Sequence, residues 1–100
     1  MTAVNPKPAP SDHKREALAS ILAAHPGNTC TVQCARIRAA LSRFSLTTFE
    51  AMRHLDVYDP RARVMQLRKA GGCITTVWTH LATASGELHR VGLYVLGAHQ

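Results

Sequence analysis

The sequence lacks the features that would direct it into or across a membrane. It has no apolar run long enough to span a bilayer, and its first residues are polar and proline-bearing, unlike the charged and then apolar start of a signal peptide. Cysteine is also scarce, and an odd count of 3 argues against a disulfide framework. We therefore expect a cytoplasmic protein with buried apolar cysteines at Cys30, Cys34 and Cys73.

The motifs of common enzymes are absent as well. The sequence has no G-x-S-x-G, no H-E-x-x-H and no phosphate-binding glycine loop. Cys30 and Cys34 would share one helix face, but a zinc site needs about four ligands, and no histidine pair lies near them. Each acidic residue has a place in a cap, a turn or an ion pair. We therefore expect no enzyme activity, no metal and no cofactor.

Acidic residues are outnumbered by basic ones. The 100 residues include 12 Lys and Arg against 6 Asp and Glu, a net charge of +6, and 46% of the residues are apolar. This length and composition indicate one globular domain, here over residues 11–100. The excess of positive charge favours an anionic partner, of which nucleic acid is the most common.

Two segments lie before residue 31, where the centre of this domain begins. Residues 1–10 contain three prolines and no apolar period, which predicts a disordered arm. Residues 11–25 predict an extra N-terminal helix that begins after Ser11 and ends before Pro26. Its narrow apolar stripe can pack back on the domain or join two copies, and we expect a homodimer through Leu18, Ile21 and Leu22.

Residues 31–72 predict a tri-helical core. In the first helix, from Thr31, we expect apolar residues such as Val32 and Ala35 to face inward and the polar residues to face outward, namely Gln33, Arg36 and Arg43. Thr47 and Glu50 have the spacing of a capping box at the start of the next helix. Its expected buried stripe consists of Phe49, Met52 and Leu55.

The third helix of this core is the most basic segment of the chain. In "DPRARVMQLRKAGG", residues 59–72, Asp59 suits the N-cap, Pro60 the first helical position and Gly71 or Gly72 the end. Val64 and Leu67 define its inner side. Its cations are Arg61, Arg63, Arg68 and Lys69.

After the two glycines, the apolar period changes from that of a helix to that of a strand. Residues 73–97 contain two alternating runs separated by a turn near Gly86, which predicts a β-hairpin. Trp78 and Tyr94 suit a cross-strand pair in this hairpin. Stacking on single-stranded bases is a less favoured alternative for these two rings.

This order of elements resembles the winged helix-turn-helix fold, a mainly α domain with a β-hairpin wing (α+β). The resemblance is closest to the small domains of this kind in phages and prophages, which have a "T-x-x-E-A" helix and an "R-I-x-x-L-R-K-x-G" helix before the wing. The matching residues are "TTFEA" at 47–51, "RVMQLRKAGGCI" at 63–74 and "GLYVL" at 92–96. The resemblance covers residues 31–97 and leaves the N-terminal helix outside.

The resemblance implies that residues 59–72 contact double-stranded DNA and that the wing contacts the flanking backbone. Gln66 can present its amide to adenine, while Arg61, Arg68 and Lys69 can reach phosphates. Arg53 and Arg90 are further phosphate candidates. For Arg63 two interpretations stay open, a phosphate contact or an ion pair with Glu50. We thus expect a phage or mobile-element transcriptional regulator that acts by occupying its operator, in the host cytoplasm if a phage encodes it.

A protein-interaction module on the same scaffold is the main alternative, because winged helices also bind proteins. The wing has few cations, and the centre of the basic helix is uncharged. A phage could use such a surface to inhibit a host nucleic-acid-binding or defence complex. The residues expected to carry this role are Met65, Leu18, Ile21 and Leu22.

Overall fold

The computed structural model describes residues 11–97, which form four helices and a three-stranded antiparallel sheet. The helices are α1 (Asp12–Ala24), α2 (Cys30–Leu41), α3 (Thr48–His54) and α4 (Pro60–Lys69). The strands are β1 (Leu46–Thr47), β2 (Ile74–Ala82) and β3 (Leu88–Leu96). This architecture confirms the α+β winged-helix fold. The expected disordered arm, residues 1–10, lies outside the described residues.

The helix starts follow from local capping chemistry. The Ser11 hydroxyl accepts from the Lys14 amide at 3.1 Å, and the Asp59 carboxylate accepts from the Ala62 amide at 3.3 Å. At α3, Thr47 and Glu50 accept from each other's amides at 3.0 Å, as the capping-box spacing predicts. These side chains satisfy amides that have no partner within the first turn.

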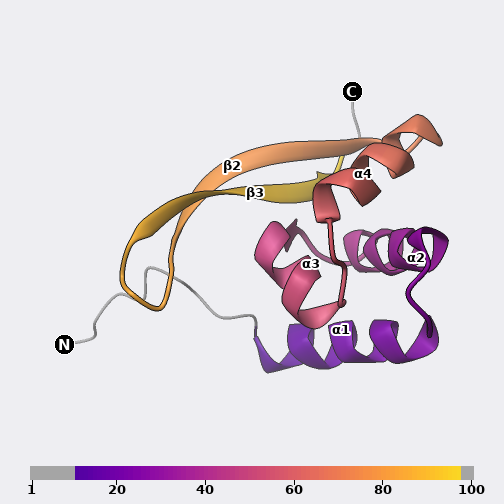
Figure 1. The fold of residues 1–100 in the computed structure, drawn as a ribbon, viewed down its shortest axis with the longest axis horizontal. Coiled ribbons are helices and arrows are strands. Elements are labelled where there is room, and N and C mark those ends of the chain that lie inside the picture. The colour runs from indigo at the N-terminus through magenta and orange to yellow at the C-terminus, as the bar shows by residue number, and fades with distance from the viewer. Residues whose placement is uncertain (1–10, 98–100) are drawn as a thin grey trace.

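Helix α1 packs on α2 and α3, on the side of the bundle away from α4 (Figure 1). Leu18 is completely buried and Ile21 nearly so, and both belong to the core that also contains Ile37, Leu55 and Val64. The expectation that Leu18 and Ile21 form a dimer contact is therefore wrong, since the same chain already covers this stripe. Leu22 is only partly buried.

The face of helix α2 that is buried differs from the predicted one. Gln33 and Arg36, expected at the surface, are buried, and Arg36 is only 2% exposed. The Arg36 guanidinium donates to the carbonyl oxygens of His25, Gly27 and Leu55 and so fixes the α1–α2 connection. The prediction was wrong because hydrogen bonds to distant backbone groups offset the desolvation of a buried cation.

The surface of α3 also differs from the prediction. Leu55 is buried as expected, but Phe49 is 39% exposed and Met52 is 48% exposed. Ala51 takes the buried position instead. The small alanine lets this short helix lie close to its neighbours, so the two larger apolar side chains remain at the surface.

The sheet has the order β1-β3-β2, and its long hairpin arches over α3 to a turn that projects beyond the helices (Figure 1). Tyr94 and Ile74 reach the core at the base of the hairpin. Trp78 lies opposite Gly92 and remains 53% exposed, whereas Tyr94 lies opposite Thr76. Trp78 and Tyr94 are therefore diagonal neighbours in the hairpin, and the expected direct cross-strand pair between them is wrong.

Candidate nucleic-acid interface

Helix α4 is anchored along its inner side by apolar packing. Pro60, Val64 and Leu67 are buried at one-turn spacing, and Val64 and Leu67 belong to the core. The helix ends where Gly71 adopts a φ of 102°, a left-handed conformation that favours glycine. An added Cβ at Gly72 would lie 2.8 Å from the Leu67 carbonyl oxygen, so the chain can leave the helix here only without a side chain.

On one flank, α4 contacts α2 through sulfur atoms. The Arg63 Nη1 atom contacts the Sγ atom of Cys30. The Cys34 thiol lies 3.7 Å from both the Arg63 carbonyl oxygen and the Gln66 Oε1 atom. Arg63 therefore faces α2, and the expected Arg63–Glu50 pair is wrong. Glu50 instead accepts from Lys14 of α1 at 3.0 Å.

On the opposite flank, Arg68 connects α4 to the wing. Its Nε atom donates to the Ile74 carbonyl oxygen at 2.9 Å, and its Nη2 atom donates to the Thr76 hydroxyl at 2.8 Å. The side chain still has exposed surface. It can therefore approach a phosphate while it fixes the base of β2 against the helix.

The face between these flanks is open to solvent. Arg61, Met65 and Lys69 are all exposed, and we call these three residues the outer face of α4. Gln66 is exposed beside them, and its amide nitrogen is not used by the Cys34 contact. No acidic residue occurs between residues 60 and 86, so no carboxylate of this segment opposes the positive charge. The arrangement suits an extended polyanion.

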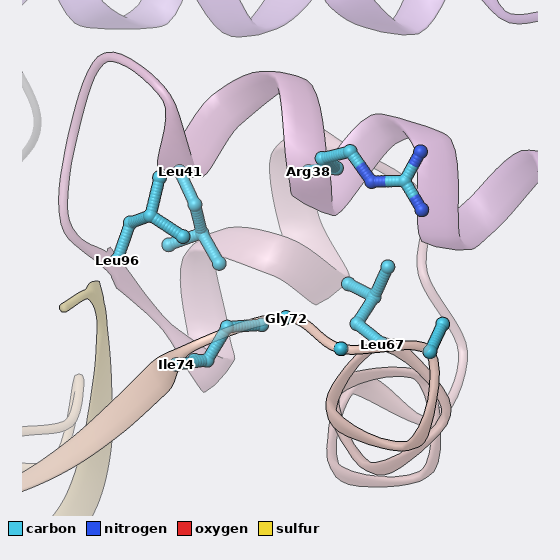
Figure 2. Close-up of a pocket in the computed structure, with 8 residues that line it drawn as sticks. Arg38, Leu41, Leu67, Gly72, Ile74 and Leu96 are labelled. Atoms are coloured by element: carbon cyan, nitrogen blue, oxygen red, sulfur yellow. The ribbon is translucent and has the colours of Figure 1, made fainter. Parts of the chain in front are cut away.

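Arg38 adds a cation that the sequence analysis missed. It is exposed on α2, two turns after Cys30 on the stripe that faces α4. It also lines a shallow groove of about 260 Å³ with Leu41, Leu67, Ile74, Leu96 and the glycines after α4. Figure 2 shows Leu41 and Leu96 at one end of this groove and Arg38 with Leu67 at the other. Cys30, Cys34 and Arg38 follow one another at intervals of four residues and therefore share one face of α2. A prediction that turned this face toward α4 would have identified Arg38.

The two remaining predicted cations lie on other elements. Arg53 is exposed in the last turn of α3. Arg90 is exposed on the wing, where its guanidinium carbon lies 4.3 Å from the centre of the Trp78 ring. Stacking on this ring restricts the guanidinium while leaving its N–H groups free to bind an anion.

The cysteines differ from the prediction of buried apolar residues. Cys30 and Cys73 are exposed, and Cys34 is intermediate. Burial raises the pKa of the Cys34 thiol, an effect that the nearby Arg63 opposes. In residues 11–97, no three His, Cys, Asp or Glu side chains are grouped so that they could hold a metal ion. None of the described helices combines the length and apolarity that a membrane span requires.

Comparison with known proteins agrees with this geometry. A family model described as a winged helix-turn-helix domain matches residues 32–99. The chain belongs to this family. In winged helix-turn-helix terms, α2, α3 and α4 are the tri-helical core and β2–β3 is the wing, while α1 precedes the matched residues. A domain of this family suggests DNA as the partner and is a non-enzymatic kind of fold. No curated protein and no solved structure matches the chain.

Proposed function

We propose that this winged helix-turn-helix protein binds double-stranded DNA sequence-specifically through the outer face of α4 and regulates transcription by occupying its site. The observation that carries the proposal is the way in which neighbouring elements fix the orientation of α4. Arg63 and Arg68 anchor opposite flanks to α2 and β2, so that Arg61, Met65 and Lys69 point away from the protein. A basic helix that is fixed in orientation and open on one face has the geometry that major-groove binding needs.

The outer face and its border divide into two kinds of chemistry. Arg61 and Lys69 carry charge and suit phosphates, which position a protein on DNA without reading its sequence. Gln66 carries an amide, which can donate to and accept from an adenine edge. Its Oε1 atom keeps a second lone pair beside the Cys34 contact, so both functions of the amide remain available.

A single copy of this domain would read few base pairs. Because Leu18 and Ile21 are buried within the chain, we propose that several copies act on repeated half-sites rather than as a dimer through α1. A phage or mobile-element origin remains a prediction from the resemblance alone, and a DNA-bound role agrees with the expected cytoplasmic location.

The test compares three variants on a sequence selected from random duplex DNA and on an unrelated duplex. Gln66→Ala should reduce discrimination between the two by about 1–3 kcal/mol and barely change non-specific binding. Lys69→Ala should weaken both complexes alike and reduce the salt slope by about one. Arg43→Ala removes an exposed cation on the α1 side and should change neither property.

The alternative function predicts the opposite pattern. Met65 is 54% exposed at the centre of the outer face, and a thioether suits a protein surface at least as well as DNA. If the domain inhibits a host complex, Met65→Ala abolishes that association, and Gln66→Ala and Lys69→Ala leave DNA binding unchanged. That result would replace the proposed function.

A further inference from the structure

Two cysteines of α2 lie at its contact with α4. Cys30 is the first residue of α2, and Cys34 follows one turn later on the same face. Cys30 is exposed to solvent, whereas Cys34 is partly covered and contacts the Arg63 carbonyl oxygen and Gln66. We call Cys30 and Cys34 the thiol pair. Cys34 also packs against the hydrophobic core.

Two positive features lie beside the Cys30 sulfur. The guanidinium of Arg63 contacts the Cys30 Sγ atom, and the sulfur is at the positive N-terminal end of α2. The Arg63 Nε atom is buried without a hydrogen-bond partner, and no carboxylate among residues 11–97 pairs with this arginine. A cysteine at a helix N-terminus beside an arginine is the arrangement that makes a thiol reactive.

Cys34 has the complementary character. Burial raises the pKa of the Cys34 thiol, so the covered environment disfavours its thiolate. The pair therefore combines an exposed nucleophile with a neighbouring covered thiol. In oxidant-sensitive sites, the first residue reacts with the oxidant and the second forms the disulfide.

We propose that the thiol pair is an oxidation site for hydroperoxides and closes to a Cys30–Cys34 disulfide. The Cys30 thiolate attacks one oxygen of hydrogen peroxide, the O–O bond breaks, and the departing hydroxide takes a proton to leave as water. Cys30 is then a sulfenic acid. The Cys34 sulfur attacks the Cys30 sulfur, and the expelled hydroxide takes the Cys34 proton and leaves as a second water.

Closing this disulfide must distort the start of α2. Side chains four apart on a helix have Cβ atoms about 5–6 Å apart, whereas a disulfide needs about 3.8 Å. The Thr29 cap, which accepts from the Val32 amide at 3.2 Å, holds this first turn and would open. Cys30 would then leave Arg63, and Cys34 would leave Gln66. If α4 binds DNA as proposed above, oxidation therefore alters the helix that contacts it.

The first experiment measures the oxidation itself and does not depend on DNA. The Cys73→Ser variant is treated with hydrogen peroxide, and its intact mass and free thiols are followed. We expect both remaining thiols to disappear together in the monomer, with the loss of two hydrogen atoms and recovery by a reducing agent. Cys34→Ser should stop at a sulfenic acid that dimedone traps on Cys30, and Cys30→Ser should leave Cys34 reduced.

Rates identify the role of Arg63. In wild type, Cys30 should react with peroxide about tenfold faster than Cys73, which is also exposed but accepts no hydrogen bond from an arginine among residues 11–97. Arg63→Gln should remove most of this difference, while Arg61→Gln, from the same helix, should leave it unchanged. Equal rates at Cys30 and Cys73, or disulfides that form only between chains, would overturn the proposal.

The second experiment measures the consequence for DNA. Peroxide should lower the affinity of the Cys73→Ser protein for duplex DNA by about tenfold or more, reversibly, and should have no effect on the Cys30→Ser/Cys73→Ser variant. If the disulfide forms but the affinity for DNA does not change, the oxidation site is supported and its coupling to α4 is contradicted. A protein that binds no DNA in either state contradicts the proposed function but leaves the mass measurement valid.

Discussion

The Lys14 ammonium group lies 3.0 Å from the Glu50 carboxylate and connects α1 to the start of α3. The two side chains are only 16% and 15% exposed, and Lys14 also donates to the Ser45 carbonyl oxygen at 2.9 Å. Glu50 simultaneously closes the capping box with Thr47. One carboxylate thus caps a helix of the core and holds the helix that precedes the matched family domain.

Breaking this ion pair should destabilise the protein. Lys14→Met should lower the free energy of unfolding by about 1–2 kcal/mol, a value reduced from that of a fully buried pair because some solvent reaches it. The double variant Lys14→Met/Glu50→Gln should lose less than the sum of the single losses. Urea denaturation measures both effects. Arg15→Gln, which breaks the exposed pair with Asp12, is the control and should leave stability unchanged. If the stability losses of Lys14→Met and Glu50→Gln are strictly additive in the double variant, the coupling between the two residues is contradicted.

Arg36 should be among the most sensitive residues of the fold. Arg36→Met keeps an unbranched, flexible side chain but leaves the carbonyl oxygens of His25, Gly27 and Leu55 without this donor, which should cost about 3 kcal/mol. Arg43→Met, at an exposed position just after α2, should stay within about 0.5 kcal/mol of wild type. Thermal and urea unfolding compare them. Equal stability of the two variants would mean that Arg36 is not held as described.

Stability should fall in mild acid because of His54. Burial at the end of α3 lowers the pKa of His54 from its ordinary value of 6.5, against the opposing effect of Glu50. The unfolded chain therefore binds a proton at a higher pH than the folded protein, and stability decreases as pH falls from 6.5 through the lower folded pKa. His54→Gln should flatten this part of the pH dependence. His80→Gln, at an exposed site on the wing, should leave it in place.

Arg68 should control how firmly the wing is held. Arg68→Gln removes the donors to Ile74 and Thr76, at a cost of about 1 kcal/mol of local stability. Hydrogen exchange should accelerate at the base of β2 and stay unchanged in α1. Lys69→Gln changes charge on the same helix without touching β2, so acceleration in that variant as well would refute a specific connection through Arg68.

The features that were predictable from the sequence are the local ones. Ser11, Asp59 and the Thr47–Glu50 box cap helices through residues three positions away, so the sequence spacing contains the whole interaction. The hairpin and the inner side of α4 follow in the same way from apolar periodicity. Together these local signals were sufficient for the fold.

The orientation of α2 was not predictable in this way. Polarity suggested that Arg36 faces water, but its partners are backbone oxygens up to 19 residues away, which no local pattern reveals. The error propagated to the site, because the face of α2 that actually meets α4 contains Cys30, Cys34 and Arg38. Glu50 was similarly assigned to Arg63, whereas Lys14 comes from a helix outside the pattern of the resemblance. Contacts between distant segments thus set the details of the site.

The most direct test of the central claim is the salt dependence of binding to random duplex DNA. If α4 and its neighbours neutralise about four phosphates, log K should fall with log salt with a slope of roughly −3 to −4. Arg61→Gln/Lys69→Gln should reduce the steepness of this slope by about two, while Arg15→Gln/Arg43→Gln, with the same loss of charge on the α1 side, should preserve it. Equal effects of the two pairs, or no binding at low salt, would contradict the assignment of α4 as the DNA-binding helix.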